Sequence, residues 1–190
     1  MSSQNKLTIK SALELVYTDD LANVCIGLKQ LEVCADLSVI EPIVAIASIT
    51  TNRAVKKEVL EFLSNVIDPK LPPLFLPFIQ EEKYASIRQE LLSVVWNSKL
   101  DYSSFLADFV EVAIEGNFII ALECLTVLEN LEGPFEEHQL LESQLHLKEY
   151  IASDRSMEDD QKTTVISEIA LYIREQNEGV DADLLFDEEE

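Results

Sequence analysis

The chain has 190 residues, of which 47% are hydrophobic, so it can bury a core rather than remain disordered. It carries 14 basic and 36 acidic side chains, a net charge of -22. Because nucleic acids and anionic membranes attract clustered Lys and Arg, this charge argues against both as ligands. It favours a basic protein surface as partner, unless the acid serves only to keep the chain soluble.

The composition favours helices. Only 4 glycines and 6 prolines are present, few for an all-β protein with many turns, and runs of Leu, Ile, Val, Ala and Glu predominate. The start of the chain has no apolar core of signal-peptide length, and no uncharged apolar stretch reaches the length of a membrane-spanning helix. Cys25, Cys34 and Cys124 fall inside helical patterns and are expected to be buried free thiols. These features predict a cytoplasmic protein.

A repeated helical hairpin organises most of the chain. After a mobile tail at residues 1–6, a single domain is predicted over 7–178, beginning with a capping helix at Leu7–Tyr17. Four units of about 32 residues follow, and their predicted ranges are 20–50, 53–80, 84–115 and 117–150. A helix at 158–176 is expected to cap the other end, before an acidic tail at 179–190.

The first helix of each unit carries an equivalent leucine. These residues are Leu28, Leu60, Leu92 and Leu125, separated by steps of 32, 32 and 33. A small or apolar residue precedes each one directly, and an apolar residue follows three positions later, which marks one stripe of a helix. Since one hairpin cannot bury such a stripe alone, neighbouring units are expected to stack.

The second helix of each unit is expected over residues 38–49, 71–80, 101–115 and 134–150. Ser38 and Asp101 are N-cap candidates. Gly133 can end one helix in the left-handed conformation and Pro134 can begin the next. Pro77 should kink or shorten the helix in which it falls.

The pattern resembles the HEAT-like repeat family over roughly residues 20–150. The resemblance implies an all-α fold, a right-handed α-solenoid of about four helical-hairpin repeats with capping helices. The signatures of tetratricopeptide and ankyrin repeats are absent, whereas a nonrepeating helical bundle remains an alternative.

Catalytic motifs are lacking. Some HEAT-like proteins hydroxylate proteins through a di-iron site held by His-Glu dipeptides, but neither His138 nor His146 is followed by Glu. Others attach bilin chromophores, and a bilin-lyase-like enzyme or accessory factor is the alternative function that the resemblance allows. No nucleophile elbow, Cys-x-x-Cys pair or Gly-rich phosphate loop occurs. We therefore predict no catalytic residues, no cofactor and no metal.

The expected function is that of a non-catalytic scaffold, adaptor or regulator that binds a basic protein segment. The resemblance implies a concave face lined by the second helices. Its predicted partner-binding residues are Asp101, Tyr102, Asp108, Glu111, Glu115, Glu136, Glu137 and Glu142. A solvated helix face would show the same acidic stripe.

Other candidate contacts are aromatic or lie at the chain end. Tyr84 and Tyr102 are possible anchors, while Trp96 is expected in the core. The triplet Leu184-Leu185-Phe186, set among acidic residues, is either a docking segment or an idle terminus. Self-assembly through an uncapped end of the solenoid is a further possibility.

Overall fold

The computed structural model describes residues 3–34, 36–153 and 160–177, and all regular structure in these ranges is helical. This confirms the all-α prediction. The α-helices are α1 (Ser3–Val16), α2 (Leu21–Cys34), α3 (Ile40–Ile49), α4 (Arg53–Ser64), α5 (Leu71–Gln80), α6 (Arg88–Asn97), α7 (Leu106–Glu115), α8 (Phe118–Asn130), α9 (Glu137–Ala152) and α10 (Asp160–Gln176). Short 3-10 helices η1 (Leu37–Val39), η2 (Glu82–Ile87) and η3 (Ser103–Phe105) precede α3, α6 and α7.

The chain divides into two compact units, residues 1–100 and 101–190. They differ sharply in charge. The first unit holds 10 basic and 12 acidic side chains, a net of -2, whereas the second holds 4 and 24, a net of -20. The acidity of the protein is therefore almost entirely a property of the second unit.

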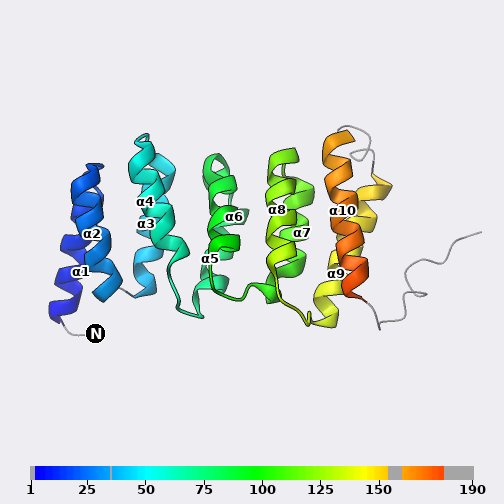
Figure 1. The fold of residues 1–190 in the computed structure, drawn as a ribbon, viewed down its shortest axis with the longest axis horizontal. Coiled ribbons are helices and arrows are strands. Elements are labelled where there is room, and N and C mark those ends of the chain that lie inside the picture. The colour runs from blue at the N-terminus through cyan, green and yellow to red at the C-terminus, as the bar shows by residue number, and fades with distance from the viewer. Residues whose placement is uncertain (1–2, 35, 154–159, 178–190) are drawn as a thin grey trace, which may run out of the picture. The chain divides into compact units, whose positions relative to one another are not determined.

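In the first unit, consecutive helices pack in pairs: α1 with α2, α3 with α4, and α5 with α6 (Figure 1). Helices α2, α4 and α6 also pack successively against one another. The predicted units instead grouped α2 with α3 and α4 with α5. The extensive pairs thus begin one helix earlier than predicted, and α1 is a member of a pair rather than a separate cap.

The second unit follows the same pattern. Helix α7 pairs with α8 and α9 pairs with α10, while α7 also packs against α9 and α8 against α10. Each helix therefore contacts its neighbour in sequence and the helix two places along. The predicted C-terminal capping helix corresponds to α10, whose partner in the pair is α9.

The periodic pattern identifies the buried face correctly. The residues that directly precede the four equivalent leucines are all buried, and they are Gly27, Val59, Leu91 and Cys124. The apolar residues three positions after each leucine are buried as well. Leu28 and Leu92 are themselves buried, whereas Leu60 and Leu125 are half-buried. The stripe is therefore centred one residue before the leucine that reveals it.

Several predicted boundaries need correction. Helix α1 begins at Ser3, so residues 3–6 are not a tail. Helix α5 continues for three residues beyond Pro77, so this proline does not end it. Helix α9 begins at Glu137, three residues after Pro134. Gly133 does not adopt the left-handed conformation, and its peptide bond to Pro134 is cis.

Asx turns recur before three of the second helices. The carboxylates of Asp36, Asp68 and Asp101 each accept a backbone N–H from two residues ahead, at 3.0, 2.9 and 2.8 Å. The steps between these aspartates are 32 and 33, the same as the leucine spacing. Ser38 is the donor to Asp36 and not the N-cap, so that prediction was displaced by two residues.

A second set of caps begins the leucine-bearing helices. The side chains of Asp20, Asn52 and Asn117 each accept a first-turn N–H of the helix that follows, at 3.1 Å. They are separated by 32 and 65 residues, one and two repeat lengths. Asp19, with φ of 54°, accepts a hydrogen bond from Thr50 Oγ1 at 2.6 Å and so connects two of these turns.

Replacing Asn52 by alanine is expected to lower the free energy of unfolding by about 1 kcal/mol, because two N–H groups of α4 lose their acceptor. Urea denaturation followed by circular dichroism measures this. Asn52→Asp is the matched control, since aspartate caps equally well, and it should retain most of the stability. Equal stability of Asn52→Ala and the wild type would contradict the assignment.

Candidate interaction surface

Helix α7 offers a single acidic stripe to solvent. Seven of its residues are buried, and the other three are Asp108, Glu111 and Glu115. Glu111 and Glu115 are exposed and Asp108 is half-buried. Steps of three and four residues place the three carboxylates on one face of the helix. All three were predicted partner-binding residues.

Both ends of α7 are held by side chains from other helices of the same unit. Gln139 of α9 is buried, and its Oε1 accepts the Ala107 N–H at 3.0 Å, one of the unpaired donors of the first turn. Lys162 of α10 donates from Nζ to the Ile114 carbonyl at 2.6 Å. A cation at that end also complements the helix dipole. The acidic stripe therefore lies on a firmly positioned helix.

Helix α9 contributes further acids beside α7. Glu142 is exposed and lies one turn after Gln139, the α9 residue that accepts the Ala107 N–H of α7. Glu136 and Glu137 are exposed at the start of α9, and the Glu136 carboxylate lies 3.3 Å from His138 Nδ1. We define the acidic surface as Asp108, Glu111, Glu115 and Glu142.

Asp101 has a structural role. Its Oδ1 accepts hydrogen bonds from Ser103 Oγ at 2.5 Å and from Ser103 N at 2.8 Å, and these hold the pKa of the carboxyl below its usual value of 3.8. Ser103 Oγ also lies 2.9 Å from the Glu132 carbonyl oxygen, so its single proton is shared between the two acceptors. Asp101 thus organises the approach to α7 and the loop before α9, although the sequence pattern assigned it to partner binding.

We expect Asp101→Ala to lower the free energy of unfolding by about 1 kcal/mol at neutral pH. The lowered folded-state pKa means that ionised Asp101 contributes stability above pH 3.8, and the contribution is lost as pH falls through the folded-state value. The difference between wild type and variant should therefore shrink in acid. Asp101→Asn, which retains the acceptor, should keep the turn with Ser103 without this pH dependence. A difference that grows on acidification would refute the role.

Tyr102 is not an exposed anchor, which corrects the prediction. Its side chain is 1% exposed and packs edge-on against Phe109, with ring centroids 6.3 Å apart. Tyr84 is also buried, against Phe78. Trp96, expected in the core, is instead 37% exposed. Whether an aromatic side chain is buried depends on its neighbours in three dimensions. The spacing of residues in the sequence did not identify those neighbours.

The cysteines and histidines show no sign of joint chemistry. None of the three cysteines forms a disulfide, and only Cys124 is fully buried, which corrects the expectation of burial for Cys25 and Cys34. His138 is exposed and His146 is half-buried. In the ranges that the structure describes, no three His, Cys, Asp or Glu side chains are grouped to hold a metal ion.

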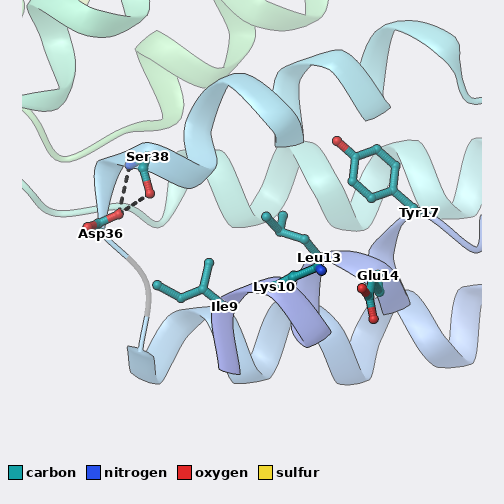
Figure 2. Close-up of a pocket in the computed structure, with 7 residues that line it drawn as sticks. All are labelled: Ile9, Lys10, Leu13, Glu14, Tyr17, Asp36 and Ser38. Carbon is teal, nitrogen blue, oxygen red and sulfur yellow. Dashed lines mark hydrogen bonds between the residues drawn. The ribbon is translucent and has the colours of Figure 1, made fainter. Parts of the chain in front are cut away.

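A hollow of about 820 Å³ lies between α1 and the start of η1 (Figure 2). Ile9 and Leu13 line it from α1, and Tyr17 lies just beyond that helix. Its charged groups are Lys10, Glu14 and Asp36. The Asp36 carboxylate already accepts a hydrogen bond from the backbone N–H of Ser38. The lining is mostly apolar and carries no arrangement typical of catalysis.

Two features of the structure were not predicted from the sequence. Gln139 is buried and caps α7, and only its three-dimensional neighbour reveals this role. In addition, Arg53, Lys56 and Lys57 line one groove, although the net charge of the chain is strongly negative. Their spacing of three and four residues on one helix was the available signal.

Comparison with known proteins identifies no relative: no protein-family model, no curated protein and no solved structure matches the chain. Within the described ranges, no helix combines the length and the apolar character needed to cross a membrane.

Proposed function

We propose that this protein is a non-catalytic binding module that receives a basic segment of another protein on its acidic surface. The observation that carries the proposal is the exposure of α7. Every residue of this helix is buried except three, and all three are acids. A basic ligand would relieve the repulsion among these carboxylates.

The distribution of charge supports the same function. The unit that holds the acidic surface has a net charge of -20, so it attracts cationic segments over a distance limited only by ionic screening. The fixed position of α7, through Gln139 and Lys162, means that little ordering is needed on binding.

We further propose that the helical pairs form an α-solenoid of HEAT-like repeats. The near-constant steps between Asp36, Asp68 and Asp101 support this, because each Asx turn comes just before an equivalent helix. So do the contacts between helices two places apart within each unit. In such an arrangement, α7 and α9 would be neighbouring helices of one binding face.

Affinity capture with the full chain, followed by titration of each recovered protein, tests the proposed function. Binding should weaken strongly between 50 and 500 mM salt, since the attraction is between exposed charges. Glu111→Lys/Glu142→Lys should abolish it, because it reverses two charges of the acidic surface that have no role in capping a helix.

The matched control is Glu168→Lys/Glu175→Lys, which makes the same charge change at exposed positions of α10 in the same unit. It should retain binding. Binding that is insensitive to salt, or that both double variants weaken equally, would reject the acidic surface as the contact site.

A further inference from the structure

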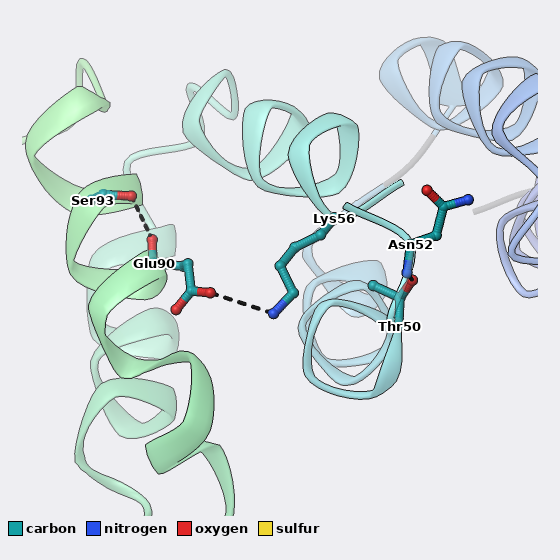
Figure 3. Close-up of polar contacts among 5 residues, drawn as sticks. All are labelled: Thr50, Asn52, Lys56, Glu90 and Ser93. Carbon is teal, nitrogen blue, oxygen red and sulfur yellow. Dashed lines mark hydrogen bonds and ion pairs between the residues drawn. The ribbon is translucent and has the colours of Figure 1, made fainter. Parts of the chain in front are cut away.

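A basic groove runs between α4 and α6 in the first unit. It has a volume of about 590 Å³, and its cations, Arg53, Lys56 and Lys57, all come from the first two turns of α4. Lys56 Nζ lies 3.3 Å from Glu90 Oε1, so this ion pair connects α4 with α6 (Figure 3). The remaining charged side chain in the lining is Glu61, and the groove is therefore net positive.

Two of the three cations are available to a ligand. Arg53 and Lys57 are exposed, and neither has a carboxylate within ion-pair distance among the described residues. Both lie at the N-terminal end of α4, where the helix dipole adds to their positive potential instead of offsetting it. An anionic ligand at this end is stabilised by the side chains and the helix together.

The groove also has an apolar element. Leu60 lines it and is half-buried, whereas Leu28 and Leu92, its equivalents in the same unit, are buried. The nearby Asn65 and Asn97 each donate to a carbonyl of their own helix or its last turn, so the cations are the strongest donors toward the groove. The matching ligand is an acidic peptide that carries apolar side chains.

The C-terminal segment of the chain, residues 180–190, has this chemistry. Leu184, Leu185 and Phe186 stand together, flanked by the acidic residues Asp181, Asp183, Asp187, Glu188, Glu189 and Glu190. The hollow beside α1 is a poorer match, because it carries Glu14 and Asp36 against the single cation Lys10. Charge therefore selects the basic groove over the larger hollow.

We propose that the basic groove binds the chain's own C-terminal segment, residues 180–190. The acidic residues would lie against Arg53 and Lys57, and an apolar residue of the Leu-Leu-Phe triplet would cover Leu60. The interaction is separate from the acidic surface, so it can hold whether or not that surface binds a basic partner.

A fluorescently labelled peptide of residues 178–190 tests the proposal by anisotropy. The receptor is the full chain carrying Leu184→Ser, Leu185→Ser and Phe186→Ser, so that its own segment does not compete. We expect saturable binding that weakens with salt. Arg53→Glu/Lys57→Glu in this receptor should weaken it by at least about tenfold, since both contacts become repulsive.

The matched control is Lys29→Glu/Lys99→Glu, which makes the same charge change at exposed sites outside the groove and should leave affinity unchanged. A peptide of scrambled order should bind at least about tenfold more weakly if the apolar triplet is seated. No binding, equal binding of the scrambled peptide, or equal loss in both double variants would overturn the proposal.

Sedimentation of the wild-type chain then identifies the source of the segment. Association that rises with concentration and is lost in Arg53→Glu/Lys57→Glu indicates a segment from a second copy. A monomer whose uptake of the labelled peptide is weaker than that of the triplet-substituted receptor indicates a segment from the same chain. A monomer that binds the peptide as tightly as that receptor would show that the native segment does not occupy the groove, which would overturn the proposal.

Discussion

Replacing Tyr102 by alanine is expected to lower the free energy of unfolding by about 3–5 kcal/mol, because a fully buried aromatic ring leaves a large cavity. The ring is 1% exposed and packs against Phe109 at the start of α7. Loss of this contact should loosen the segment that Asp101 and Ser103 organise. Chemical denaturation of the full chain, followed by circular dichroism, measures the change.

Tyr102→Phe is the informative control, because it keeps the ring and removes only the hydroxyl. The hydroxyl is buried with no hydrogen-bond partner among the described residues, and burial raises its pKa. Removing an unpaired buried polar group is neutral or stabilising. The phenylalanine variant should therefore be at least as stable as the wild type. A loss of 1 kcal/mol or more in Tyr102→Phe would mean that the hydroxyl is hydrogen-bonded in solution.

The positions of the helices were largely predictable from the sequence. Helix α5 has the predicted bounds, and α7 with η3 covers all but two residues of the predicted range 101–115. Apolar spacing succeeds because each helix must bury one stripe, and that requirement is local to the helix. The loop before α9 was mispredicted, because Gly133 and Pro134 fit a helix junction equally well by composition.

The pairing of helices was less predictable. A repeat has no intrinsic starting point, so the leucine spacing gives its length but not which neighbours form the tighter pair. Recurring Asx turns mark the junctions before α3, α5 and α7, but they do not show which helices pair more tightly. Asp36, Asp68 and Asp101 recur with the same step, and an Asx turn has a recognisable residue preference. The apolar positions are therefore only one part of the periodic pattern, and the recurring Asx turns are another.

The candidate surface was predictable where exposure follows from periodicity. Glu111 and Glu115 lie opposite the buried face of α7, as a helical stripe requires. The prediction that Tyr102 is exposed was wrong because this residue lies outside the regular helix. There the helical period of 3.6 residues no longer determines which way a side chain points. The role of Gln139 depends on a neighbour 32 residues away in sequence, which no local pattern contains.

Gly27, the single glycine of the first unit, is expected to tolerate no larger side chain. It is buried in α2, where an added Cβ would lie 2.6 Å from the Ala12 carbonyl oxygen and 2.8 Å from Val16 Cγ2 of α1. The carbonyl belongs to the backbone, so α1 must move as a whole to make room. Gly27→Leu should lower the free energy of unfolding by about 1–3 kcal/mol through overpacking.

Hydrogen exchange resolves where this loss occurs. Since α1 packs chiefly against α2, displacement should reduce amide protection in α1 first, before α4 and α6 are affected. Ala22→Leu is the matched control, because it adds the same side chain at an exposed position of α2 and should change stability by less than about 0.5 kcal/mol.

Leucine has a higher helix propensity than glycine by nearly 1 kcal/mol, so local preference alone predicts stabilisation by Gly27→Leu. The sign of the measured change therefore decides whether the close approach of the two backbones or the propensity of the helix dominates at this position.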